Sequence, residues 1–337
     1  MPVTPAPDPR TVLDAVVFRI GDAPVTRVEI RRWAERFDPS FVARVARRAA
    51  LGGLDLAEDA SIEAEVETEA SEFRYARELE SAESLVEWIA AQGITVESWW
   101  EAIRRSVLER RYAGQRIAGR DAGAGEADPD DEAGVRVADL VVADLLGPAA
   151  EALARRFAVA RAVAQWSPVA SPVASPVAYD DRHDALERIW SGWRSALTTE
   201  EALQQAVSRE PLSWLVLDLV QSDWSSVNAA REAVSCVLVD GGDLEEVARA
   251  AGVGVEVRSC LLAEVPDALH DALLTAAPGD VVGPIALPPR WVVARLLRKR
   301  VPSLREPLVR AAAARDLECR SAAPFVEQQV VWSERVK

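Results

Sequence analysis

The order of apolar and polar residues between Leu212 and Arg300 predicts a small domain that mixes strands and helices. Leu212–Val220 is a nearly continuous apolar run of strand length, and Val255–Ser259 alternates apolar and polar residues as a half-buried strand does. Serine and aspartate caps and paired glycines mark helix ends. The predicted elements are a strand at Leu212–Val220, a helix from Ser225 and Ser226 to the turn Asp240–Gly242, a helix at Asp243–Gly252, a strand at Val255–Ser259, a helix at Pro266–Leu274, a turn at Pro278–Pro284 and a strand at Trp291–Leu297.

The two ends of the chain predict a second domain. Ala15–Ile20 has the composition of a strand and Gly21–Pro24 that of a turn, and Thr26–Glu29 has the spacing of a capping box that opens a helix. The apolar face expected for that helix is Ile30, Trp33, Ala34 and Phe37. Near the C-terminus we expect a helix at Leu308–Leu317, and then a strand at Phe325–Trp332 that can pair with the N-terminal strand.

The middle of the chain is predicted to be helical with two interruptions. Residues 119–134 are rich in glycine and acidic residues, which favours a loop. Ser-Pro-Val-Ala occurs three times in residues 167–178, which favours an extended linker, with a ligand for a polyproline-binding domain as the alternative. A similar pattern, an aromatic and basic turn before a capped helix, occurs in residues 73–88 and again in residues 189–203. Either a duplication or the repeated use of capping signals would explain it.

Two motifs carry a resemblance to a known family. Gly242-Asp-Leu-Glu-Glu-Val-Ala248 and Pro278-Gly-Asp-Val-Val-Gly-Pro284, followed by a last strand with the basic end Arg298-Lys-Arg300, resemble the parvulin domain of PpiC- and SurA-type prolyl isomerases. The N-terminal strand, turn and capped helix resemble the start of the SurA-type chaperone domain, whose core the C-terminal segment completes. The resemblance implies an α+β, mostly helical fold in which a parvulin-like α/β domain is inserted into a helical chaperone domain.

The domain limits expected on this basis divide the chain into seven segments. They are an N-terminal SurA-like helical domain at 1–118, an acidic loop at 119–134, a helical segment at 135–166, the linker at 167–178, a helical segment at 179–210, a degenerate parvulin-like domain at 211–301 and a C-terminal helix and strand at 302–337 that pack on the N-terminal domain.

The histidines of the parvulin catalytic cluster have no counterpart here. The family's position on the first strand falls near Val216 or Asp218, and its position on the last strand falls near Val292. The two histidines of the chain, His183 and His270, match neither position. Loss of amide resonance makes a barrier of about 18–20 kcal/mol, and lowering it requires groups that favour the twisted peptide. The resemblance therefore implies a parvulin-like domain without its catalytic cluster, in which a peptide groove can survive.

Several residues are candidates for peptide contacts. The chain has eleven tryptophans, and Trp99 and Trp100 follow a cap at Thr95, so that one ring is expected in the core and the other nearer the surface. Trp214 lies on the first parvulin-like strand and is expected to face either the groove or the core. The residues predicted to contact peptide are Trp214, Val216, Asp218, Cys236, Val292, Trp99 and Trp100.

Composition narrows the classes of partner and cofactor. A net charge of −15 over 337 residues argues against binding to nucleic-acid phosphates. There is no apolar run of membrane-spanning length, and the proline-rich start lacks the pattern of a secretory signal, so a cytoplasmic location is expected. Three scattered cysteines are too few for a zinc site, and we expect Cys236 to be a structural thiol. We expect no cofactor.

His183 stands among Asp180, Asp181 and Asp184, which raises the question of a metal site. A solvated histidine at a polar helix start is the favoured interpretation.

Three functions fit the sequence. The first is a peptide-binding chaperone or scaffold without catalysis, which the resemblance extends to PpiC-related proteins that present a precursor to modifying enzymes in ribosomal peptide maturation. The second is enzymatic, either residual prolyl isomerase activity or another reaction at Asp218, Cys236 or the carboxylates near Glu256. The third is a structural subunit whose own linker fills the groove. An apolar lining near Asp218 and Val292 would favour binding, and a carboxylate with a hydroxyl or thiol partner there would favour catalysis.

Overall fold

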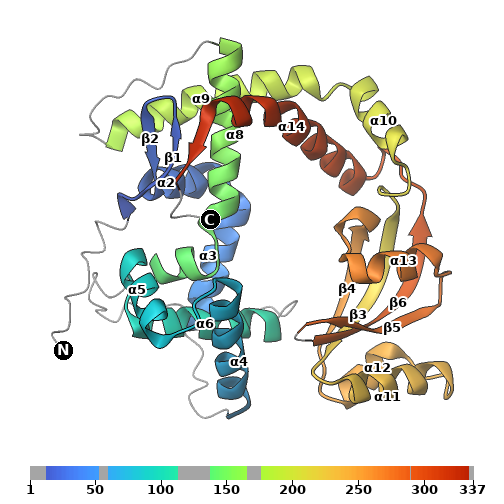
Figure 1. The fold of residues 1–337 in the computed structure, drawn as a ribbon. Coiled ribbons are helices and arrows are strands. Elements are labelled where there is room, and N and C mark those ends of the chain that lie inside the picture. The colour runs from blue at the N-terminus through green and yellow to red at the C-terminus, as the bar shows by residue number, and fades with distance from the viewer. Residues whose placement is uncertain (1–12, 53–59, 113–136, 165–175, 289, 334–337) are drawn as a thin grey trace. The chain divides into compact units, whose positions relative to one another are not determined.

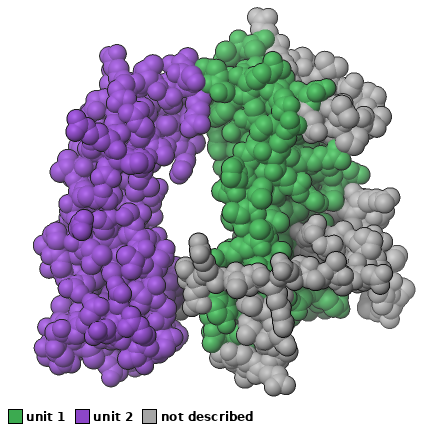
Figure 2. Space-filling model, turned by 180° about the vertical axis from the view of Figure 1, so that it is seen from behind, with its two compact units in different colours: residues 1–193, 322–337 green, residues 194–321 purple. Residues whose placement is uncertain are grey.

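The computed structural model describes residues 13–52, 60–112, 137–164, 176–288 and 290–333 (Figure 1). The chain is α+β and mostly helical, with two small antiparallel sheets, so the expected fold class is confirmed at this level. It forms two compact units, residues 1–193 with 322–337 (unit 1) and residues 194–321 (unit 2), which Figure 2 distinguishes by colour. These limits cut across the predicted segments 179–210 and 302–337.

Unit 1 consists of helices around a three-stranded sheet. Its elements are β1 (Val16–Ile20), β2 (Ala23–Thr26), α2 (Arg27–Phe37), α3 (Pro39–Gly52), α4 (Ala60–Ala76), α5 (Ala82–Gln92), α6 (Val96–Arg111), a helical stretch at 137–142, α8 (Leu146–Ala164), most of α9 (Pro176–Leu197), the end of α14 (Pro307–Gln329) and β7 (Val330–Trp332).

The sheet of unit 1 joins the two ends of the chain. Strand β1 pairs antiparallel with β2 on one side and with β7 on the other, so the predicted pairing of the C-terminal strand with the N-terminal strand is observed. The strand is shorter than predicted, because α14 continues through Pro324 to Gln329. Within this helical extension, Ala322 packs with Val159 of α8 and Trp190 of α9, which explains why the segment remains helical.

Helix α2 begins as the sequence predicts, but half of the expected capping box is missing. Thr26 Oγ1 accepts a hydrogen bond from Glu29 N, whereas the Glu29 carboxylate pairs with Arg182 and lies 3.6 Å from His183 Nε2. His183 is only 1% exposed, so the expectation of a solvated histidine was wrong. It is buried because α9 packs Leu186 into the core of unit 1.

A buried ionic cluster holds a second part of unit 1 together. Arg48 of α3 and Arg105 of α6 are 1% and 4% exposed, and both donate to Asp139 Oδ1, from Arg48 Nε at 3.0 Å and from Arg105 Nε at 2.9 Å. Arg48 also donates to Glu109 and to the carbonyl of Ala102. The carboxylate of Asp139 thus fixes the helical stretch 137–142 against two long helices.

Unit 2 is built on a four-stranded antiparallel sheet of order β4-β3-β6-β5. Its elements are the end of α9, α10 (Glu200–Arg209), β3 (Val216–Trp224), α11 (Val227–Leu238), α12 (Leu244–Ala250), β4 (Val255–Leu261), a 3₁₀ turn at Leu262–Glu264, α13 (Asp267–Thr275), β5 (Val281–Leu287), β6 (Arg290–Arg300) and the first part of α14. The strands and helices follow each other in the predicted order. The second half of the predicted turn, from Val281 to Pro284, belongs to strand β5.

Helices cover both faces of this sheet (Figure 1). Helix α13 packs on one face, where Leu269 and Leu273 contact Leu217 and Leu296. We call this the α13 face. Helices α11 and α12 cover part of the opposite face, and α10 with the first turns of α14 covers the rest. The residues of that last cluster are Leu203, Val207, Trp214, Val216, Leu261, Leu304, Val309, Ala313 and Ala314. The start of α14 therefore belongs to unit 2, although the sequence assigned it to the N-terminal domain.

The two predicted interruptions fall largely outside the described residues. This applies to the loop at 119–134 and to residues 167–175 of the predicted linker. Helix α9 begins at Pro176, so the last three residues of that linker are helical. Within the described part of the chain, no helix combines the length and apolar character needed to cross a bilayer.

The buried cluster predicts a large loss of stability when the carboxylate that Arg48 and Arg105 share is neutralised. We expect Asp139→Asn to lower the free energy of unfolding by about 3–5 kcal/mol, because Arg48 and Arg105 lose their shared partner in the interior. Urea unfolding followed by circular dichroism measures this. Asp271→Asn, at a fully exposed carboxylate, is the matched control and should change stability by less than about 0.5 kcal/mol. Equal effects of the two substitutions would contradict the assignment.

The pairing of β7 with β1 predicts a contrast between two neighbouring residues. The Trp332 ring lies 5.2 Å from the buried ring of Phe18, whereas Val331 is 64% exposed on the same strand. We expect Trp332→Ala to cost about 2–3 kcal/mol and Val331→Ala about 0.5 kcal/mol or less, measured by urea unfolding. A similar loss of stability in both variants would show that the contact between Trp332 and Phe18 does not stabilise the pairing of β7 with β1.

Candidate functional site

The sheet of unit 2 separates the strand residues that the sequence grouped into one groove. Side chains alternate between faces along β3, so Val216 and Asp218 lie on the face opposite Leu217 and Leu219. Val292 of β6 is opposite Asp223 in the register and belongs to the α13 face. Val216 and Val292 are both fully buried, in different apolar clusters. The predicted groove between Asp218 and Val292 is therefore not formed.

The remaining predicted contacts are dispersed. Trp214 is 9% exposed and packs with Val207 and Val309, so it is a core residue and not part of an open groove. Cys236 is half-buried on α11, and this helix covers the face of the sheet opposite to Val292. In unit 1, Trp99 is buried and Trp100 is partly buried beside it, as the helical spacing predicts.

Asp218 has a hydroxyl partner, the arrangement that would favour catalysis. Its Oδ1 accepts from Ser259 Oγ at 2.6 Å and from Arg300 Nη2 at 2.9 Å, and Arg300 also pairs with Glu306. The hydrogen bond from Ser259 and then the Arg300 guanidinium hold the pKa of Asp218 below its ordinary value. A general base works best when its pKa is near the working pH. This carboxylate is therefore a weak base, and its contacts join β3, β4, β6 and the start of α14.

The α13 face carries a polar row at the end of the sheet away from Leu217. Arg258 Nη2 of β4 donates to Gln221 Oε1 at 3.1 Å, and Gln221 Nε2 donates to Asp223 Oδ1 at 3.1 Å. Arg290, at the start of β6, pairs with the other oxygen of Asp223. Gln221 is buried although Asp223 and Arg290 are exposed. The row thus crosses three strands and ends at the surface.

Apolar side chains lie beside this row on the same face. Ile285 and Leu287 of β5 are half-buried and pack against the same cluster as Val292. Cys260 of β4 is also on this face, and burial raises the pKa of its thiol, so it stays protonated at neutral pH. Strands β3, β4, β5 and β6 are each fully described, and none of the four contains a histidine. We call Gln221, Asp223, Arg258, Arg290, Ile285 and Leu287 the open end of the α13 face.

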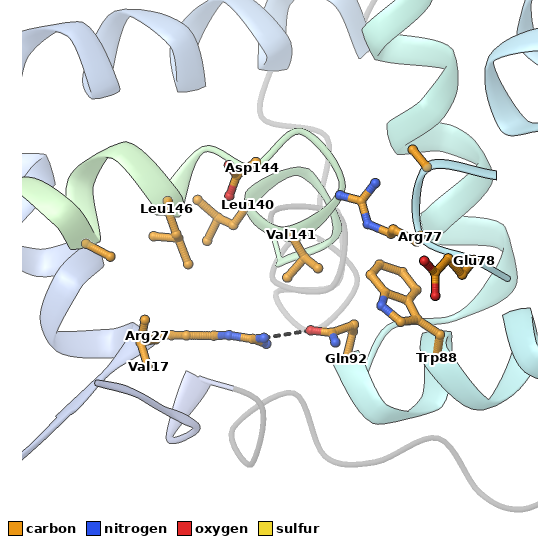
Figure 3. A pocket seen from close by; sticks show the side chains of 13 residues that line it. Val17, Arg27, Arg77, Glu78, Trp88, Gln92, Leu140, Val141, Asp144 and Leu146 are labelled. Atoms are coloured by element: carbon orange, nitrogen blue, oxygen red, sulfur yellow. Dashed lines mark hydrogen bonds between the residues drawn. The ribbon is translucent and has the colours of Figure 1, made fainter. Parts of the chain in front are cut away.

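Unit 1 contains a separate pocket of about 610 Å³ (Figure 3). Its wall combines residues from β1, the start of α2, the end of α4, α5, the stretch 137–142 and the start of α8. The lining residues are Val17, Arg27, Ala76, Arg77, Glu78, Trp88, Gln92, Leu140, Val141, Asp144, Leu146, Gly147 and Ala150.

Arg27 is the most deeply placed charge of this pocket. Its position as the first residue of α2, directly after the Thr26 cap, directs it toward the end of α5, where Nη2 donates to Gln92 Oε1 at 2.6 Å (Figure 3). The residue is 8% exposed, and burial lowers the pKa of its guanidinium. Among the described residues no carboxylate lies within ion-pair distance of it. Arg27 is therefore a buried cation whose protein partner is a neutral amide.

The opposite wall of the pocket is charged, and two of its residues have a left-handed backbone. Arg77 stacks over the Phe73 ring at 3.9 Å and feels the charge of Asp144. Glu78 has φ 57° and Asp144 has φ 47°, and these are the two non-glycine residues with positive φ in the described chain. Each residue ends a helix in the usual way, because Leu79 N donates to the Arg74 carbonyl and Leu145 N donates to the Leu140 carbonyl across the left-handed residue.

Sequence reasoning missed both of these places for different reasons. Strict alternation along β3 could have grouped Leu219, Gln221 and Asp223 on one face and kept Asp218 off it. The pocket gathers Arg27, Gln92 and Asp144 from distant segments, and no local pattern connects them. The aspartates near His183 form no metal site, since no group of three potential ligands lies within the described residues.

The contacts of Asp218 predict how acid affects unit 2. Because its pKa in the folded state is below the ordinary value of 3.8, ionised Asp218 stabilises the fold above that pH, and the contribution is lost as pH falls through the lowered pKa. We expect Asp218→Asn to destabilise the protein at pH 6, with a difference from wild type that shrinks below pH 3.8. Urea midpoints across pH 2–7 measure this, with Asp271→Asn as control. A difference independent of pH would show that Asp218 contributes through its neutral hydrogen bonds.

Comparison of the sequence with protein-family models and with curated proteins gives no match in either case. The two sites described above are therefore interpreted from this chain's own residues.

Proposed function

We propose that this protein binds extended peptide segments at the open end of the α13 face and does not catalyse their isomerisation. The observation that carries the proposal is the half-exposed apolar pair Ile285 and Leu287 beside a polar row that offers both donors and acceptors. An apolar floor with a few oriented polar groups is the usual composition of a binding site.

The chemistry of this face supports binding over catalysis. Its carboxylate, Asp223, is engaged by Arg290 and Gln221, and its thiol, Cys260, is buried and protonated. Neither group is poised to accept a proton or to attack a peptide. The parvulin-like order of elements, a strand, two helices, a strand, a helix and two strands, also supports a domain that holds peptides. That likeness is an analogy at the level of fold and motif.

The client we propose is a ribosomally made precursor peptide, which the protein would hold for modifying enzymes. This follows the resemblance of the sequence motifs to PpiC-related proteins. The SurA-like arrangement of the two ends belongs to the same proposal, and it is supported by the β1–β7 pairing that joins them.

Exchange NMR on short peptides with one proline flanked by apolar residues tests the proposal with the full chain. We expect peptide signals to broaden as protein is added, without growth of cis–trans exchange peaks. Exchange peaks that increase with protein would make the chain an isomerase, and unchanged signals across the panel would contradict peptide binding at this face.

Two substitutions on the same sheet locate the binding surface. Leu287→Ser should weaken binding about fivefold, because the peptide loses roughly 1 kcal/mol of apolar contact. Val257→Ser is the matched control, since Val257 is 63% exposed on the opposite face of edge strand β4. Equal loss of affinity in both variants would remove the open end of the α13 face from the site.

A further inference from the structure

We infer that the pocket of unit 1 is a binding site for a single carboxylate on an apolar body, with Arg27 and Gln92 as the groups that recognise the carboxylate. This site lies in a different unit from the proposed peptide-binding face and is independent of that function.

The charge of Arg27 is the first reason. A buried guanidinium is costly unless an anion compensates it, and Arg27 has only the Gln92 carbonyl oxygen at 2.6 Å among the described residues. The other buried arginines of unit 1 have carboxylate partners, as Arg48 and Arg105 have in Asp139. Arg27 differs from them in lining a pocket, where a ligand can supply the missing charge.

Gln92 provides a second donor at the same place. Its Oε1 is occupied by Arg27, so its Nε2 is free to donate, and it has no acceptor among the described residues. Gln92 is buried at the end of α5, where Gly93 at φ 64° terminates the helix and holds the residue in place. A carboxylate can accept from a guanidinium and an amide together, and charge-assisted bonds of this kind are the strong ones.

The rest of the wall determines what accompanies the carboxylate. Val17, Leu140 and Leu146 provide apolar surface on the side of Arg27, and the Trp88 ring provides more beyond Gln92, near Arg77 and Glu78 (Figure 3). Glu78, Asp144 and Arg77 together give the rest of the lining a net charge of −1, which disfavours a second negative charge on the ligand. The volume of about 610 Å³ suits a small molecule or the end of a peptide. The ligand class is thus a monocarboxylate with an aryl or branched alkyl group.

Calorimetry with a matched pair of probes tests this inference. We expect 3-phenylpropionate to bind the full chain at least about tenfold more tightly than 3-phenylpropanamide, which has the same shape without the charge. Arg27→Met should remove this preference, while Arg31→Met, one turn along α2 at an arginine paired with Glu35, should retain it. Equal binding of acid and amide, no binding of either, or an unchanged preference in Arg27→Met would each overturn the inference.

A stability measurement separates a ligand-binding role of Arg27 from a structural one. Without ligand, Arg27→Met should melt at the same temperature as wild type or above it, because a neutral side chain removes an uncompensated buried charge. A clear fall in melting temperature would assign Arg27 to the core. Methyl NMR of the wild type then decides: the inference requires the Leu140 and Leu146 methyl signals to shift with 3-phenylpropionate, and unshifted signals would overturn it.

A pair of peptides identifies the source of the carboxylate. A peptide with an apolar last residue and a free C-terminus is compared with the same peptide amidated at its C-terminus. A preference for the free form, lost in Arg27→Met, assigns the pocket to peptide ends. Binding of 3-phenylpropionate without such a preference assigns it to small carboxylic acids.

Discussion

The carboxylate of Asp139 between the guanidinium groups of Arg48 and Arg105 is the contact on which much of unit 1 depends. It fastens the short helical stretch 137–142 to α3 and α6. The next residues, Leu140 and Val141, form one wall of the pocket, and the turn at Asp144 leads into α8. Three buried charges in hydrogen-bond contact are tolerable only together, so this cluster fixes one arrangement of these helices and with it the shape of the pocket.

In the pocket of unit 1 a buried positive charge lacks, in the part of the chain that the structure describes, the carboxylate partner that the cluster at Asp139 provides. Where Arg48 and Arg105 share a carboxylate, Arg27 has a neutral amide, and two residues of the facing wall adopt left-handed backbone. The two left-handed residues end helices and keep their capping hydrogen bonds, so the uncompensated charge of Arg27 is the feature that lowers the stability of the free protein. Proteins retain such a cost mainly where binding or catalysis requires it, and this distinguishes the pocket from the surrounding core.

In unit 2 the alternation of strand side chains decides which residues can act together. Asp218 and Gln221 are three residues apart on β3 and lie on opposite faces. Asp218 serves as an ionic link between strands and α14, whereas Gln221 belongs to the polar row of the α13 face. The residues that the sequence assigned to one groove are thus divided between two apolar clusters, each with its own helical cover.

The sequence by itself determined the local elements. Caps at Thr26, Thr95 and Ser226 begin helices where the pattern predicts, and the order of elements from β3 to β6 follows from apolar periodicity, because these signals involve residues within a few positions of each other. Only the tertiary structure decided the sites. Register and face set the neighbours of Asp218 and Val292, packing buried His183 and Trp214, and the pocket joins Arg27, Gln92 and Asp144 from segments far apart in the chain. Such contacts depend on how helices pack, which no local pattern encodes.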